Sequence, residues 1–363
     1  MQLRQAALAV LCTLSFFTSI PVRAQTTFGI WVNARELATL PISGPAWLAL
    51  KKRADVVLGI PLISDQTQSN NVAVLAKALV FARTGEQRYR LEVIDQCMQA
   101  INTELGGRTL ALGRELAAYV IAAELVSLPP DKNVIFRAWL RRTLTEPLDG
   151  ESLRATHERR PNNWGTHAGA SRAAVAAYLG DMVELQRTAL VFKGWLGDRT
   201  AYAGFSFGEL SWQCDGMRPV GINPAGCMKG GHNIDGVLPD DQRRGGIFAW
   251  PPLQENYVWE ALQGAIVEAE ILNRLGFDTF NWSNKALLRA VTWLYQQDAF
   301  PATGDDSWEP HIINFRYGSR FLAPVPTHPG KNMGWTDWTH GPGRTRPPLA
   351  AARPVPVGVA SPP

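Results

Sequence analysis

The sequence lacks metal-ligand spacing, a strong net charge and, after its first residues, any apolar run long enough to span a membrane. Its six histidines show neither an HxxxH pattern nor Cys/His ligand spacing, so we expect no metal and no cofactor. The formal net charge is only +4, and lysine and arginine are not clustered on one predicted face. Nucleic acid is therefore excluded as a partner.

The first 24 residues are typical of a secretory signal. Arg4 precedes an apolar run over residues 6–20, and Val22-x-Ala24 matches a small-residue cleavage site. The mature chain is therefore predicted to begin at Gln25 and to be secreted or periplasmic.

Few cysteines remain beyond this segment. Cys97 lies in an apolar helical pattern and is predicted to be a buried small hydrophobe. Cys214 and Cys227 flank a loop rich in glycine and proline, and an exported protein permits a disulfide between them. The sequence leaves that pairing open, because it does not show whether the two Cα atoms approach each other.

Helical periodicity dominates what is present. The predicted helices span residues 72–84, 87–103, 110–126, 134–144, 163–179, 181–195, 256–275 and 283–297, with Ser283 as an N-cap. Short connections make them four helical hairpins. We therefore expect an all-α fold, an incomplete α/α toroid of antiparallel hairpins with long loops at one rim. An irregular bundle or a solenoid is the alternative, although no fixed-period repeat is seen.

The domain organisation follows from composition. Residues 25–340 are predicted to form a single domain. Residues 341–363 contain many prolines and no acidic residue, which predicts a disordered tail.

Thirteen tryptophans are many for 363 residues. A single tryptophan is usually part of a core. Six of them lie in loop-like stretches, and as a group these indicate carbohydrate binding, because aromatic planes pack against sugar rings; they are Trp164, Trp212, Trp250, Trp308, Trp335 and Trp338.

Tyr257 begins the most informative helix of the chain. It follows a polar, glycine-rich stretch that starts with Asp235-Gly236-Val237-Leu238-Pro239 and carries Arg243 and Arg244. Nearby positive charge stabilises a phenolate, so Tyr257 is a candidate base. The alternative is an amphipathic anchor with its ring in the core.

A second polar cluster precedes another predicted helix. The stretch over residues 158–167 places two arginines, Asn162, Asn163, Trp164 and His167 at or near a helix start. An N-cap explains one asparagine but not the whole set.

These two stretches resemble the alginate lyases and related uronate-polysaccharide lyases. The matching motifs are Asn162-Asn163, residues 235–239, Arg244-Gly245, and Tyr257 followed by Ala261-Leu262. The resemblance spans roughly residues 44–338. It departs from the family in two places: Trp164 stands where the family has histidine, and residues 247–252 form an apparent insertion.

The resemblance implies an α/α toroid enzyme that cleaves an acidic polysaccharide by β-elimination. Asn163 would neutralise the substrate carboxylate, with His167 assisting. Arg244 would hold Tyr257 or bind the carboxylate, and Tyr257 would remove the C5 proton and then protonate O4. We predict these four as catalytic residues.

Other residues are predicted to bind substrate: Asn162, Trp164, Arg243 and His232. We expect a mannuronan-type substrate, with glucuronan open, and a monomeric enzyme. Two alternatives remain: an inverting glycoside hydrolase using carboxylates among Asp240, Asp241, Asp305, Asp306 and Glu309, and a carbohydrate-binding protein with a decayed site.

Overall fold

The computed structural model describes residues 29–344. The predicted signal segment, with its cleavage site, and most of the predicted tail lie outside these residues. The helices are α1 (Ala34–Thr39), α2 (Pro45–Ala54), α3 (Asn70–Thr84), α4 (Gln87–Gln99), α5 (Thr109–Val126), α6 (Pro130–Thr143), α7 (Leu153–Arg159), α8 (Asn163–Leu179), α9 (Met182–Trp195), α10 (Pro239–Gln242), η1 (Arg243–Gly245), α11 (Asn256–Arg274), η2 (Thr279–Asn281), α12 (Trp282–Gln296), η3 (Gly304–Asp306), α13 (Glu309–Tyr317) and α14 (Thr336–Thr339). The strands β1 (Met228–Lys229) and β2 (His232–Asn233) form one small antiparallel hairpin.

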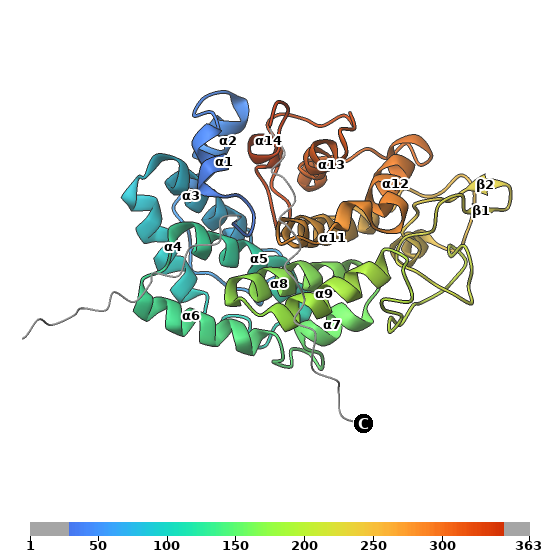
Figure 1. The fold of residues 1–363 in the computed structure, drawn as a ribbon, viewed down its shortest axis with the longest axis horizontal. Helices are drawn as coiled ribbons and strands as arrows, with labels where there is room; N and C mark the ends of the chain where they lie inside the picture. The colour runs from blue at the N-terminus through green and yellow to red at the C-terminus, as the bar shows by residue number, and fades with distance from the viewer. Residues whose placement is uncertain (1–28, 345–363) are drawn as a thin grey trace, which may run out of the picture.

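Four pairs of consecutive helices organise the fold, α3/α4, α5/α6, α8/α9 and α11/α12, and the two helices pack closely on each other in α3/α4 and α8/α9. The first helix of each pair is buried almost all round, while its partner buries one face. A helix that is apolar on every side belongs in the interior. The pairs therefore form an inner and an outer layer, and Figure 1 shows α5, α8 and α11 side by side in the middle of the molecule. The predicted all-α toroid is confirmed.

The inner helices run parallel, and glycines set their register. A Cβ at Gly113 of α5 would lie 2.9 Å from Ala168 N, and one turn later Ala117 N donates to Ser171 Oγ at 3.0 Å. A Cβ at Gly264 of α11 would lie 2.4 Å from His167 N. Since glycine removes these collisions, the backbones of α5, α8 and α11 pack closely with their N-terminal ends at the same side.

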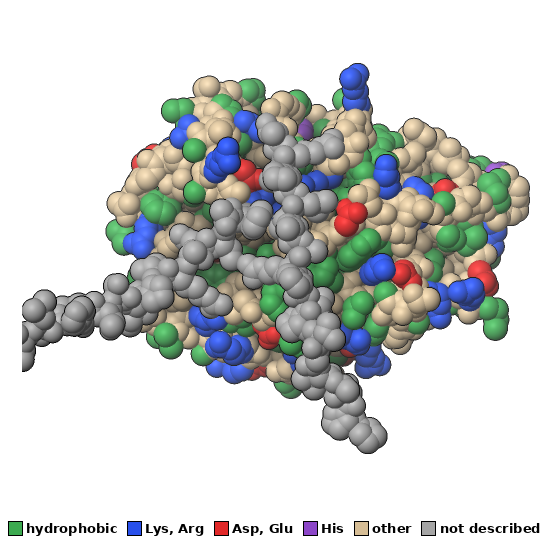
Figure 2. Space-filling view, in the orientation of Figure 1, with side chains coloured by type: hydrophobic (Ala, Val, Ile, Leu, Met, Phe, Trp, Pro, Cys, Tyr) green, Lys and Arg blue, Asp and Glu red, His purple; other side chains and the backbone are tan. Residues whose placement is uncertain are grey.

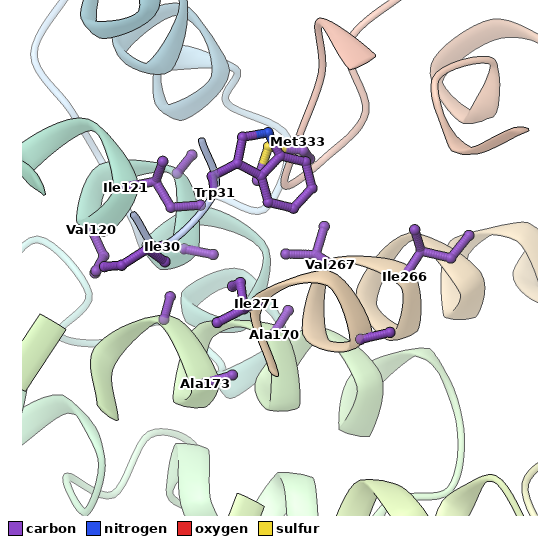
Figure 3. Close-up of a cluster of buried hydrophobic side chains, with 14 of the residues drawn as sticks. Ile30, Trp31, Val120, Ile121, Ala170, Ala173, Ile266, Val267, Ile271 and Met333 are labelled. Carbon is purple, nitrogen blue, oxygen red and sulfur yellow. The ribbon is translucent and has the colours of Figure 1, made fainter. Parts of the chain in front are cut away.

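The core joins residues that are distant in sequence. Figure 3 shows Ile30 and Trp31, which precede α1, in one cluster with Val120 of α5, Ala173 of α8 and Ile271 of α11, and Trp31 lies beside Met333. The two ends of the described chain also meet, because Trp47 of α2 packs on Trp338 of α14 with ring centroids 5.4 Å apart. The N-terminal segment is thus part of the domain's core.

Three details differ from the sequence expectations. The second predicted helix ends at Gln99 rather than at residue 103. Ser283 is not an N-cap: α12 begins at Trp282, and Ser283 has a φ of 49° inside it. Six short helices were not predicted, because their apolar residues make too few turns to show a period: α1, α2, α7, α10, α13 and α14.

Most of the loop tryptophans are core residues. Trp212, Trp308, Trp335 and Trp338 are buried, so for these four the suggestion of a sugar-binding rim was wrong. Trp164 and Trp250 are half-buried and remain able to contact a ligand.

Cys97 is buried and free, as predicted. The pairing that the sequence left open does form, because Cys214 and Cys227 make a disulfide with Cα atoms 5.8 Å apart. No helix within residues 29–344 is long and apolar enough to cross a membrane. On the face shown in Figure 2, the visible lysine and arginine side chains are spread out rather than gathered in one basic stripe.

Candidate functional site

A buried aspartate attaches the segment after residue 235 to the start of α8. Pro239 begins α10, where its missing N–H costs nothing. Two residues later, Asp241 Oδ1 accepts a hydrogen bond from Asn163 N at 3.1 Å. The polypeptide then continues through η1, so Arg244 is held within one turn of this contact.

Arg244 and Tyr257 are in direct contact. The guanidinium carbon lies 3.6 Å from the centroid of the tyrosine ring, which is a close cation–π geometry. Tyr257 sits in the first turn of α11, where Glu255 accepts its N–H at 3.1 Å. The tyrosine is 39 % exposed, so the predicted base is open to solvent and is not a core anchor.

One turn further into α8 and α11, another pair of side chains lies close together. With the two contacts described above it completes a ring of neighbouring residues, called the circuit below. Glu260 follows Tyr257 by three residues and therefore shares its face of α11. Its Oε2 lies 3.8 Å from His167 Nε2, beyond hydrogen-bond distance. His167 in turn follows Asn163 by four residues on α8, so a series of contacts through Asp241 and Glu260 links the four predicted catalytic residues.

Burial and nearby charges determine the protonation states of His167 and Glu260. Burial lowers the pKa of His167 to about 4, Glu260 opposes that effect, and Arg114 and Lys331 add to it. Burial would raise the pKa of Glu260, but His167 and Arg114 outweigh it and lower the value to about 2. At neutral pH the site therefore contains a neutral imidazole next to an ion pair between Glu260 and Arg114.

Two of the predicted residues keep their hydrogen-bonding capacity. Asn163 is 1 % exposed, yet neither atom of its amide has a hydrogen-bond partner within residues 29–344. Both ring nitrogens of His167 are likewise without a partner there. Buried polar groups are normally paired, so the unpaired atoms of these two side chains call for a partner that the described residues do not supply.

Three of the four predicted binding residues already have partners within the protein. Asn162 caps α8, with its Oδ1 accepting from Trp164 N at 3.2 Å. Trp164 lies under the guanidinium of Arg160, 5.3 Å from the ring centroid. Arg243 is bound by Asp240 at 2.9 Å.

The fourth predicted binding residue, His232, lies outside this circuit. It stacks on Trp250 with centroids 4.3 Å apart and rings nearly parallel. Trp250 belongs to the apparent insertion, which is a loop before α11. The two stacked rings form an aromatic surface on the loops that precede α11.

Sequence reasoning missed Arg114, Glu260 and Lys331. The first two lie in the apolar stretches of α5 and α11, and a charged residue at a position predicted to be buried was the available signal. Lys331 pairs with Asp305 at 2.7 Å, and its backbone N–H donates to Gln263 Oε1 at 2.8 Å. Lys331 had no such signal, because it reaches the site only through a loop from the far end of the domain.

The electrostatic setting favours an anion. The helices α8 and α11 both direct their N-terminal ends toward this site, and helix N-termini carry partial positive charge. Arg244 adds a full positive charge, whereas the charge of Lys331 is paired with Asp305. No group of three or more metal-ligating side chains occurs within the described part of the chain.

A separate cavity of about 410 Å³ lies between α13 and residues 341–344, lined by His311, Asn314, Phe321 and others. None of the circuit residues lines it, so it is distinct from the site described above.

Comparison with known proteins agrees with the motifs. Residues 73–211 match the model of the family described as alginate lyase, which confirms the predicted resemblance and supports a polysaccharide lyase. The match includes Asn163 and His167 and ends before Arg244 and Tyr257.

Among solved structures, the chain is similar to the crystal structure of an alginate lyase from Bacteroides ovatus, with 14 % identity and a TM-score of 0.49, over 80 % of this chain and 92 % of that one. No curated protein sequence matches the chain.

Proposed function

We propose that this alginate-lyase-like protein cleaves a uronic-acid polysaccharide by β-elimination and leaves a 4,5-unsaturated end. The observation that carries the proposal is the contact of Arg244 with an exposed Tyr257, in a circuit that also contains the unpaired amide of Asn163 and the neutral ring of His167. A phenol, a guanidinium, an amide and an imidazole are the groups that this reaction needs.

The first step is removal of the C5 proton. That proton is weakly acidic while the neighbouring carboxylate is charged. Asn163 neutralises the carboxylate by hydrogen bonding, and His167 supports it, which stabilises the enolate-like intermediate as charge develops. Both groups are buried, so their hydrogen bonds act in a low-dielectric environment where they are strongest.

Tyr257 carries the proton between the two reacting atoms. Its phenolate takes the proton from C5, the C4–C5 double bond forms as the bond from C4 to O4 breaks, and the phenol returns the proton to O4. Arg244 favours the phenolate through its positive charge against the ring. One residue can perform both transfers when H5 and O4 lie on the same ring face.

This geometry selects the substrate. In β-mannuronate H5 and O4 share a face, and glucuronate has the same configuration at these carbons. Guluronate has them on opposite faces and would need a second group. The proposed substrate is therefore a mannuronan-type alginate or a glucuronan, and the enzyme acts as an exported monomer without a cofactor.

The test is direct. Purified protein is incubated with mannuronan, glucuronan and polyguluronate, and the ultraviolet absorbance of the unsaturated product is followed. We expect it to rise with one of the first two and to stay low with polyguluronate. Reducing ends without absorbance would indicate a hydrolase, and neither signal would indicate a binding protein.

The hydrolase alternative lacks an open pair of carboxyl groups among its predicted candidates. Asp240, Asp241, Asp306 and Glu309 are all buried. An inverting hydrolase needs two carboxyl groups across the scissile bond with room for a water. Of the carboxyl groups predicted for that role, only Asp305 reaches solvent, where it is paired with Lys331.

A further inference from the structure

Asp241 links the two motif segments of the site. Its side chain is 1 % exposed, and its Oδ1 accepts the backbone N–H of Asn163 across 78 residues of sequence. Asn162 caps the following N–H of α8, so each of these first two helix donors has a partner. This contact ties the segment that bears Arg244 to the helix that bears Asn163.

Three polar atoms of the Asp241–Asn163 pair have no hydrogen-bond partner within residues 29–344: Asp241 Oδ2, Asn163 Oδ1 and Asn163 Nδ2. A buried, ionised carboxylate oxygen without a donor is costly. An amide without a fixed neighbour can turn over and present oxygen where nitrogen is needed. A proton on Asp241 Oδ2 answers both difficulties, because it makes the acid neutral and gives the amide oxygen a donor.

The surroundings of Asp241 favour the neutral acid. Burial raises the pKa of Asp241 well above its ordinary value, and the nearby Asp240 adds to that effect. The hydrogen bond from Asn163 and the charges of Arg244 and Arg243 lower the pKa, but by less than burial raises it.

We propose that Asp241 is a positioning residue for Asn163: one carboxyl oxygen accepts the Asn163 N–H, and the other, as a neutral acid, donates to the Asn163 side-chain oxygen. The amide nitrogen of Asn163 is thereby turned toward the substrate carboxylate. The assignment rests on the proposed lyase function for its catalytic consequence, although the protonation itself does not depend on it.

Asparagine at position 241 separates this role from that of a charged carboxylate. An Asp241→Asn side chain can accept from Asn163 N and donate to Asn163 Oδ1, as the neutral acid does. We expect D241N to lose less than about threefold in kcat, whereas D241A loses about 10- to 100-fold with little change in KM, the scale of a misplaced catalytic group. Asp298, another buried aspartate with both oxygens unpaired within residues 29–344, supplies the control: D298A should leave kcat near the wild-type value.

The route through Asn163 is tested by combining variants. If Asp241 acts by orienting Asn163, D241A should cost almost nothing further in the N163A background, since coupled residues are not additive. Equal losses for D241N and D241A, or full additivity with N163A, would overturn the assignment.

A measurement that needs neither substrate nor a truncated side chain completes the design. The infrared difference spectrum between wild type and D241N at neutral pH should show the carbonyl band of one protonated carboxylic acid, because the other buried acids are common to both proteins and cancel. Absence of that difference band would refute the neutral acid even if every D241A preparation were misfolded. A difference band together with no activity of the wild type on any uronan would instead refute the proposed function alone.

Discussion

Tyr257 and Asn163 occupy the same site but differ in their access to solvent. Tyr257 is 39 % exposed and covered on one ring face by Arg244, whereas Asn163 is 1 % exposed. The exposed residue can exchange protons with a substrate, and the buried one can contribute hydrogen bonds that water does not weaken. These environments match the separate roles proposed for them.

Replacing Tyr257 by phenylalanine removes the hydroxyl and keeps the ring under Arg244. We expect kcat to fall by at least about 10²- to 10⁴-fold, the usual contribution of acid–base catalysis. Binding of the polysaccharide should change little. Calorimetry can measure this binding because the Tyr257→Phe variant does not cleave the polysaccharide. A variant with wild-type turnover would mean that another group is the base.

Asn163→Ala removes a donor whose interaction is strongest in the transition state. The expected loss is about 10²- to 10³-fold in kcat with a nearly constant KM, as for an oxyanion-stabilising group. Steady-state kinetics on the preferred uronan measures both constants. An increase in KM with unchanged kcat would make Asn163 a plain binding residue.

Among the elements, the packing of α8 against α11 decides whether the site forms. The two helices approach closely because a Cβ at Gly264 would lie 2.3 Å from Thr166 C and 2.4 Å from His167 N. These are backbone atoms, so no side-chain rotation can relieve the contact. Glycine at this position is what allows Glu260 to lie level with the first turn of α8.

Gly264→Ala should therefore force the helices apart. Alanine normally stabilises a helix interior by about 1 kcal/mol over glycine, whereas overpacking costs about 1–3 kcal/mol. We expect a lower free energy of unfolding in urea and a reduced kcat, because Asn163 and Tyr257 are carried on the two separated helices. A variant more stable than wild type would show that the backbones do not touch here.

At the scale of the whole molecule, burial shifts the pKa of many ionisable groups in the direction that favours the neutral form. Burial lowers the pKa of each of four histidines, His157, His167, His311 and His340. It raises the pKa of each of eight acids: Glu104, Glu115, Glu124, Asp241, Glu268, Asp298, Asp306 and Glu309. The two sets act on stability with opposite signs.

The signs follow from which state binds more protons. Unfolded histidine, with a pKa of 6.5, binds a proton that folded His167 does not, so this contribution to stability is lost as pH falls from about 6.5 to about 4. A buried neutral acid holds a proton that the unfolded chain releases, so its contribution is lost as pH rises. Above pH 6.5 the acids dominate, and we expect the melting temperature to fall as pH increases toward 8.

Glu124 lies away from the site and allows the effect of one such acid on stability to be measured by itself. Burial raises its pKa to about 7, while the hydrogen bond from Ile30 N and the charge of Arg274 partly oppose this. Glu124→Gln keeps an acceptor for Ile30 N but does not titrate. Between pH 4.5 and 7, wild type should lose about 1.4 kcal/mol per pH unit relative to E124Q in urea unfolding. Parallel curves for the two proteins would contradict the raised pKa of Glu124.

Long apolar patterns made much of the fold predictable. The helix over residues 163–179 was predicted with the bounds that the structure has, because its apolar residues continue for several turns and Gly180 ends it with a φ of 66°. Asp181 likewise caps α9 by accepting from Glu184 N. The start of α12 was not predictable in this way, because the residues at positions 283–285 have positive φ values that no local pattern signals.

The site was predictable where its residues stand in motifs. Asn163, Arg244 and Tyr257 belong to short segments whose polarity is unusual for a helix start, and the structure brings them together. Arg114 and Glu260 form an ion pair across 146 residues of sequence, and no spacing along the chain predicts such a pair. The burial of four loop tryptophans is of the same kind, since it depends on which helices cover them.

The sequence by itself determined the long helices, their succession in pairs and the kinds of functional group available, because these depend on residues a few positions apart. Only the tertiary structure decided that His167 is neutral, that Arg244 covers Tyr257 and that Asp241 holds Asn163. Each of those facts depends on how closely helices from distant parts of the chain approach, and burial and electrostatic interaction both vary steeply with that distance.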